Sequence, residues 1–130
     1  KELLLEEQQR GAALARLLPQ LDVEIDALQL QACKLTQLAG IAVAAAQWGI
    51  ARDKLYAGYL WSWLENAVMA GVKLVPLGQT QGQQTLKSMA SAIERAVELS
   101  KSVTEPGSVT PAMAIASSRH ETQYTRLFRS

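Results

Sequence analysis

The sequence is poor in the residues that most catalytic and metal sites use. Its 130 residues include one cysteine, one histidine and one phenylalanine. A single thiol, Cys33, makes no internal disulfide and fits a reducing compartment. No CxxC, HxxxH or HExxH pattern occurs, and a metal site needs several such ligands at fixed spacing. We therefore expect no cofactor and no metal site within one chain, although a symmetric dimer that pairs two copies of His120 stays open.

Signatures of catalysis are missing as well. One histidine without a nucleophile-elbow motif gives no Ser-His-Asp arrangement. The glycine-containing segment LGQTQGQQ lacks the lysine and the spacing of a P-loop. We expect a protein that is not an enzyme and has no catalytic residues, with Cys33 as a small inert residue of the core.

Neither an excess of charge nor a long apolar run is present. The net charge is +1, with 13 basic and 12 acidic residues, which argues against binding to a nucleic-acid backbone. The longest apolar stretch, LAGIAVAAA, is well short of the roughly 20 residues that span a bilayer. The charged start, KELLLEEQQR, does not resemble a signal peptide. We expect a cytoplasmic protein without nucleic-acid or membrane partners.

What the sequence does contain is one helical pattern after another, without the alternation of strands. The first expected helix runs to about Leu18, before Pro19, and the second runs from the acidic cluster Asp22, Glu24 and Asp26 to about Trp48, before Gly49. The third runs from near Asp53 to Lys73 or Leu74, and the fourth from Thr80 to about Ser100. The fifth starts at Thr110-Pro111 and runs to about Gln123. The pattern predicts an all-α fold: one compact bundle-like domain of about five helices over residues 1–130, with a short C-terminal tail at 124–130. Because the chain starts inside a helical pattern without an N-cap, we expect a fragment of a longer protein.

The third expected helix is apolar on nearly every face between residues 55 and 72, so we expect it to be central and buried. One stripe of it carries Ser62, Asn66, Met69 and Lys73. The ordinary interpretation of this stripe is a satisfied helix contact or the solvated side of the helix. A sharper hypothesis is that Lys73, close to the chain reversal VPLGQ, helps to form a polar recognition surface.

The C-terminal segment RHETQYTRLFRS mixes arginines with Tyr124, Leu127 and Phe128. Arginine and aromatic residues are the types that anchor protein interfaces. Composition alone leaves open whether Leu127 and Phe128 dock on a partner or fold back on the chain's own core. We expect a helix through about Gln123, followed by residues that order fully only when a partner is bound.

Three blocks carry a resemblance to a known family: EEQQRGAALARLL, WSWLENAVMAGVKLVPLGQTQGQQ and PAMAIASSRHETQYTRLFRS. In this order and spacing, the chain resembles the UreF family of urease accessory proteins over essentially its whole length. The family's N-terminal region, with its LPIGAFAYSQGLE-like motif, is absent from this sequence. The resemblance thus implies the C-terminal larger part of such a protein.

The resemblance also implies a function and a set of binding residues. It implies an all-helical cytosolic chaperone that joins a UreD/UreH-type scaffold and recruits a UreG-type GTPase, so that nickel reaches apo-urease. Some members form dimers, so a homodimer is among the expected assemblies. The alternative function that it implies is regulation of the partner GTPase, by activation of GTP hydrolysis or by gating. The AGVKLVP, RHETQY and RLF motifs contain the residues expected to bind partners: Lys73, Arg119, His120, Glu121, Tyr124, Arg126, Leu127 and Phe128.

Overall fold

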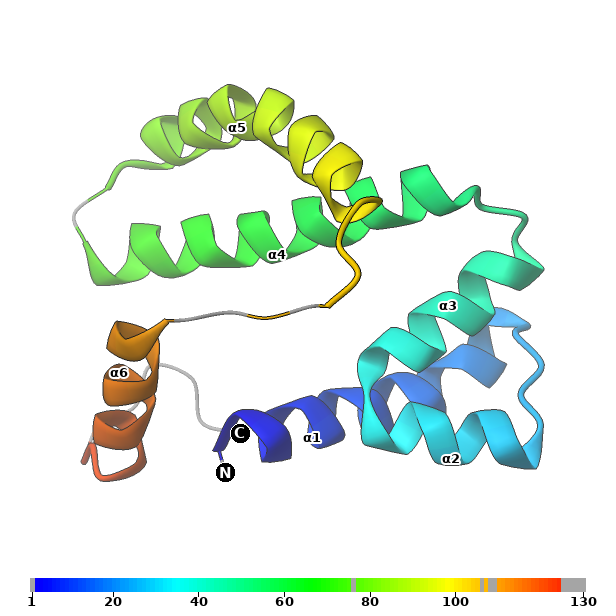
Figure 1. Cartoon of the computed structure of the whole chain (residues 1–130). Coiled ribbons are helices and arrows are strands. Elements are labelled where there is room, and N and C mark those ends of the chain that lie inside the picture. The colour runs from blue at the N-terminus through cyan, green and yellow to red at the C-terminus, as the bar shows by residue number, and fades with distance from the viewer. Residues whose placement is uncertain (1, 76, 106, 108–109, 125–130) are drawn as a thin grey trace. The chain divides into compact units, whose positions relative to one another are not determined.

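The computed structural model describes residues 2–75, 77–105, 107 and 110–124, and every regular element in these ranges is helical (Figure 1). The elements are α1 (Glu2–Leu17), the 3-10 turn η1 (Leu18–Leu21), α2 (Ala27–Leu35), α3 (Gln37–Gln47), α4 (Arg52–Leu74), α5 (Gln79–Ser100) and α6 (Pro111–Glu121). The predicted all-α fold class is confirmed.

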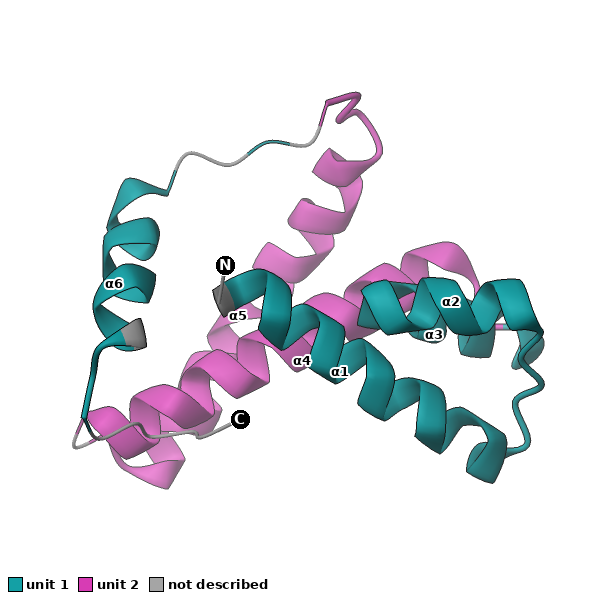
Figure 2. Ribbon diagram, turned by 90° about the horizontal axis from the view of Figure 1, so that it is seen from below, with its two compact units in different colours: residues 1–49, 107–130 teal, residues 50–106 magenta. Residues whose placement is uncertain are grey.

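The contacts divide the chain into two compact units (Figure 2). Unit 1 consists of residues 1–49 and 107–130, and unit 2 consists of residues 50–106. The single domain expected over residues 1–130, and the docking tail expected at 124–130, stay predictions.

Most helix boundaries follow the local signals in the sequence. α1 gives way to η1 just before Pro19, and Gly49 adopts a left-handed φ of 65° after α3. Such a φ is favourable for glycine because it has no Cβ. α6 begins at Pro111 as expected but ends at Glu121, two residues before Gln123. Thr110 occupies the N-cap position of α6 without a side-chain capping hydrogen bond.

The second expected helix is in fact two helices, so the prediction of one continuous helix to Trp48 was wrong. Asp26 starts α2 with a reciprocal capping box, in which Gln29 N donates to Asp26 Oδ1 over 2.7 Å and Asp26 N donates to Gln29 Oε1 over 3.0 Å. At Thr36 the backbone becomes extended, with φ −153° and ψ 140°. The Thr36 hydroxyl then accepts from Leu38 N over 3.2 Å. Thr36 is therefore both the end of α2 and the N-cap of α3.

A carboxylate from α1 completes the start of α3. Glu7 Oε1 accepts from the Thr36 hydroxyl over 2.5 Å and from Gln37 N over 3.0 Å. Glu7 Oε2 accepts from Gln37 Nε2 over 3.4 Å. An acceptor with negative charge is favourable here because the first N–H groups of a helix have no partner within the helix. Glu7 thus ties α1 to the junction between α2 and α3.

The same junction approaches the backbone of α1 at Gly11. A Cβ at this position would overlap the Cys33 carbonyl oxygen and would lie 2.9 Å from Thr36 C. A second glycine, Gly40 on α3, leaves space for Leu14: a Cβ there would lie 2.9 Å from Leu14 Cδ2. Helices α1, α2 and α3 therefore approach one another at positions where a side chain would be in the way.

Around these contacts unit 1 forms a small apolar core. Its buried cluster is Leu18, Val23 and Ala44, with Leu14, Ile25 and Val43 packed against it. Cys33 is also buried, with 0% of its surface exposed, which confirms that it is a core residue. The small side chains of α3 allow α1 and α2 to come close to it.

Replacing Gly11 with alanine should destabilise the protein by roughly 2–4 kcal/mol, because the new methyl group meets backbone atoms that cannot rotate away. Urea denaturation measures this change in the free energy of unfolding. The matched control is Gly58→Ala in α4, where nothing lies within 4 Å of the added Cβ, and which should stabilise by about 0.5–1 kcal/mol. Equal effects of the two substitutions would contradict the close approach at Gly11.

Unit 2 is a hairpin of the two longest helices, α4 and α5 (Figure 1). A Cβ on Gly82 would lie 3.0 Å from Val72 Cγ2 and 3.4 Å from Val68 Cγ1, so α5 crosses α4 closely at this point. Val68, Leu86 and Val97 are the buried large apolar residues of the unit. The hairpin has one apolar seam between its two helices.

The expectation that the third predicted helix is buried on most sides was wrong. Val68 is the one residue of α4 that is buried, whereas Tyr56, Trp61 and Trp63 are 39%, 39% and 60% exposed. Within unit 2, α4 has α5 as its only neighbouring helix among the described residues. One neighbour covers one side of a helix and leaves its other apolar side chains at the surface.

An ion-pair network joins the two open ends of the hairpin. Lys101 Nζ lies 2.9 Å from Asp53 Oδ2 at the start of α4 and 2.9 Å from Glu98 Oε2 on α5. Hydrogen bonds to Glu98 and then to Asp53 raise the pKa of Lys101 above its ordinary value of 10.5. All three side chains are substantially exposed, so their contribution to stability is modest.

This network predicts a loss of stability at high pH. A cationic group whose pKa is higher in the folded state than in the unfolded state makes its full contribution to stability at any pH below its unfolded-state pKa. This contribution disappears as the pH rises through the folded-state pKa. The stability difference between the wild type and Lys101→Met should therefore be present at neutral pH and shrink above pH 10.5. Denaturant titrations across this range measure it, with Lys87→Met on the exposed side of α5 as control. A difference that persists unchanged in strong alkali would contradict the assignment.

Candidate docking surface

α6 positions the first of the predicted binding residues. Pro111 pre-sets the φ angle of the first turn, and Met113 N donates to Thr110 O over 3.0 Å. Arg119 and His120 lie in the last turn of the helix. Positive charge is favourable there because the unpaired carbonyl groups make the C-terminus of a helix negative. The helix thus places Arg119 and His120 one after the other at its C-terminal end.

α6 is covered very little by the rest of unit 1. Its described side chains are exposed except Ser117 and His120, which are half-buried. Met113 and Ile115 are 52% and 56% exposed although both are apolar. A helix of 11 residues is marginally stable by itself in water. An apolar, cationic and weakly packed helix is the kind of element that a partner protein can cover.

The segment after α6 is described as far as Tyr124. Thr122 N donates to Arg119 O over 3.3 Å and Gln123 N donates to His120 O over 3.2 Å, which closes the helix. Tyr124 is fully exposed. Arg126, Leu127 and Phe128 lie outside the described residues, as does the side chain of Glu121. The predicted roles of all these residues in binding remain predictions.

Lys73, the remaining predicted binding residue, belongs to unit 2. It lies in the last turn of α4 and is exposed. Ser62 and Asn66 on the same stripe are exposed too, and Asn66 Nδ2 donates to Ser62 O over 2.9 Å. The three polar residues of the stripe are therefore on the solvated side of α4, one of the two forms of its ordinary interpretation, whereas Met69 is half-buried. Lys73 and α6 belong to different units.

A cluster of potential metal ligands is not assembled in the described part of the chain. No group of three or more histidine, cysteine, aspartate or glutamate residues converges there. Among the described helices, none combines the length and the apolar character that crossing a membrane requires.

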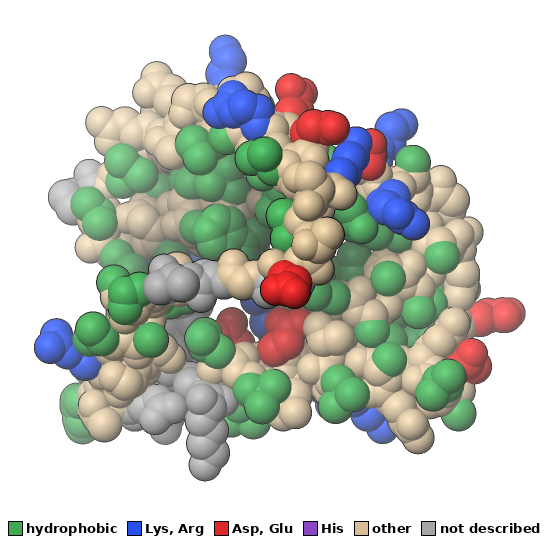
Figure 3. Space-filling view, viewed as in Figure 1, with side chains coloured by type: hydrophobic (Ala, Val, Ile, Leu, Met, Phe, Trp, Pro, Cys, Tyr) green, Lys and Arg blue, Asp and Glu red, His purple; other side chains and the backbone are tan. Residues whose placement is uncertain are grey.

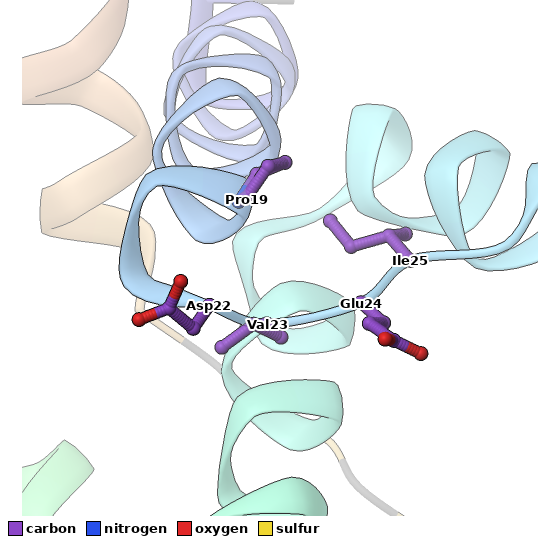
Figure 4. A pocket seen from close by; sticks show the side chains of 5 residues that line it. All are labelled: Pro19, Asp22, Val23, Glu24 and Ile25. Atoms are coloured by element: carbon purple, nitrogen blue, oxygen red, sulfur yellow. The ribbon is translucent and has the colours of Figure 1, made fainter.

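A shallow hollow at the turn between η1 and α2 has a volume of about 490 Å³ (Figure 4). Its lining residues are Pro19, Asp22, Val23, Glu24 and Ile25. The carboxylates of Asp22 and Glu24 point to different sides. The Glu24 backbone is fixed to the end of α3, since Gln47 Nε2 donates to Glu24 O over 2.6 Å and Glu24 N donates to Gln47 Oε1 over 3.0 Å. The two carboxylates of this turn do not converge on a common point, and its backbone is held to α3 by the two hydrogen bonds with Gln47.

Comparison with protein families gives a clear match. The family model described as UreF matches residues 1–90 of the chain. This range includes the whole of α1 to α4 and the first half of α5.

Curated proteins extend the similarity to the full sequence. The urease accessory protein UreF of Pseudomonas putida strain F1 is 50% identical over 131 aligned residues, which cover 99% of this chain and 58% of that protein. The protein of the same name from Alcanivorax borkumensis is 47% identical over 138 residues, covering 100% and 60%. That from Marinomonas sp. strain MWYL1 is 44% identical over 132 residues, covering 100% and 56%. The chain thus spans less than two thirds of the length of these relatives.

Proposed function

The chain belongs to the UreF family, and from that premise we propose that it is an accessory protein of urease maturation that acts by docking other proteins. Its relatives are named as accessory proteins of urease and not as the enzyme itself. The observation that carries the docking role is α6, where Met113, Ile115 and Arg119 are exposed on a weakly packed helix.

The finer proposal concerns the partners. The chain bridges a UreD/UreH-type scaffold and a UreG-type GTPase, so that nickel is delivered to apo-urease as cargo and not as a resident cofactor. The proposed docking residues are Lys73, Arg119, His120, Glu121, Tyr124, Arg126, Leu127 and Phe128. The physical support is that guanidinium groups and aromatic rings combine directional hydrogen bonding with large apolar area, which makes them frequent interface anchors. Homodimers and a cytoplasmic location belong to the same proposal.

A pull-down on the immobilised scaffold protein tests the docking residues. Deleting residues 124–130, or combining Arg119→Ala with Arg126→Ala, should weaken binding by roughly thirtyfold or more, because truncation of an interface anchor costs about 2 kcal/mol or more. The matched control for the double variant combines Lys87→Ala with Arg95→Ala on the exposed side of α5, which removes two positive charges in unit 2. Recruitment of scaffold and GTPase that is undiminished by the deletion would contradict the proposal.

A second readout separates docking from regulation of the GTPase. GTP turnover is measured in the assembled complex, at protein concentrations where every variant is bound. Docking alone leaves the turnover of the bound variants equal to that of the wild type. A bound Arg126→Ala variant with slower turnover would instead assign a regulatory role to the tail.

A further inference from the structure

A second apolar stripe runs along α4, away from α5. Its members recur every three or four residues and are Tyr56, Leu60, Trp63, Ala67, Ala70 and Leu74. At 3.6 residues per turn this stripe lies on a different side of the helix from Val68 and Val72, which contact α5 at Gly82. Trp63 is 60% exposed and Leu74 is 68% exposed. One helix thus has two apolar sides, and α5 covers one of them.

α5 carries a matching stripe next to its own buried side. Its members are Met89, Ala92, Ala96 and Leu99, again three or four residues apart. Met89 and Leu99 are 40% and 67% exposed. In Figure 3 apolar side chains reach the surface over α4 and α5, and charged side chains gather over the C-terminal part of α5.

The two stripes lie on the same side of the hairpin. α4 and α5 are antiparallel, because Lys101 after the end of α5 pairs with Asp53 at the start of α4. On each helix, viewed from its own N-terminus, the apolar stripe lies anticlockwise of the side that contacts the other helix at Gly82. Because the two helices run in opposite directions, the same rotation places both stripes on one face of the hairpin. The opposite face carries the polar side chains Ser62, Asn66 and Lys73 of α4 and Lys87, Ser91 and Glu94 of α5. The hairpin as a whole is therefore amphipathic.

The composition of the apolar face indicates what covers it. A repeat of three and four residues on both helices is the spacing that accepts a further helix by interlocking side chains. Alanines at four of the ten positions allow that helix to approach closely. None of the ten residues is charged, which is typical of permanent interfaces and domain cores and not of transient docking sites.

We propose that this face docks a helix from the region that the longer UreF relatives possess and this chain does not span. The match covers 58% of the P. putida relative, so roughly two fifths of that protein lies outside it. A permanent, uncharged helix-docking face is satisfied most directly by a segment of the same polypeptide, which is present whenever the hairpin is. α4 then becomes a helix with apolar contacts on both sides, which explains why its sequence is apolar on nearly every face.

A chimera tests the proposal. The remaining region of the P. putida relative is fused to the 130 residues of this chain. Trp48→Phe and Trp61→Phe leave Trp63 as the only tryptophan of this chain, and every tryptophan of the fused region is replaced by phenylalanine as well. Trp63 fluorescence should be readily quenched by acrylamide in the 130-residue chain and several-fold less in the chimera. Equal quenching in both proteins overturns the proposal, as does a Trp63 that is already shielded in the chain alone. Shielding that depends on protein concentration overturns it too, because it identifies a second copy as the occupant.

A pair of charge substitutions adds a second measurement. Trp63→Glu should lower the melting temperature of the chimera by roughly 5 °C or more, since it buries an unpaired charge. The same substitution should have little effect on the 130-residue chain. Asn66→Glu, on the polar side of the same helix, should have the same small effect in both proteins. Equal effects of Trp63→Glu on the two proteins overturn the proposal.

If the chimera does not fold, the remaining region is co-expressed as a separate tagged polypeptide. In a pull-down, the tagged region should then retain the wild-type chain and the Asn66→Glu variant but not the Trp63→Glu variant. Failure to retain the wild-type chain, or retention that Trp63→Glu does not change, overturns the proposal. Each of these results is independent of binding to the scaffold or the GTPase, so the proposed function is tested separately.

Discussion

The contact between α1 and the junction of α2 and α3 is the constraint on which unit 1 depends. Gly11 leaves no room for a Cβ beside the Cys33 carbonyl group, and one turn earlier Glu7 accepts the first N–H of α3. The two interactions act at the same place: one permits the close approach, and the other satisfies the polar groups that the helix break exposes. Without a capped break at Thr36, α2 and α3 would continue as one helix and would not fold back along α1.

In unit 2 a glycine again permits two helices to approach closely. Gly82 lets α5 approach Val68 and Val72 of α4, but two helices bury only one side of each. The polar stripe of Ser62 and Asn66 lies toward solvent, and the stripe that contains Trp63 is left at the surface. An exposed apolar face of this kind lowers solubility unless another segment covers it. The seam between α4 and α5 therefore buries only part of the apolar surface of the hairpin, and a neighbouring segment is needed for the rest.

The two proposed binding elements differ in physical character, which suits different occupants. α6 presents Arg119 beside exposed apolar side chains such as Ile115, a mixture that favours recognition of a separate protein. The face around Trp63 lacks charge, which favours a permanent partner helix. The proposed docking function accounts for surfaces of both kinds, because it rests on contacts with other polypeptide segments.

The sequence by itself determined the helices, because their signals are local. Pro19, Gly49 and Pro111 mark boundaries within a turn or so of the chain, and the helical spacing of apolar residues needs no distant contact to be recognised. The motifs around Lys73 and His120 likewise indicate the family by themselves, since the order and spacing of motifs are properties of the sequence. Only the tertiary structure decided that the helix expected to reach Trp48 breaks at Thr36, since the break is stabilised by Glu7, which is 29 residues away in sequence. The exposure of Trp63 was decided at the same level: composition shows that a side chain is apolar, but the number of neighbouring helices determines whether it is buried.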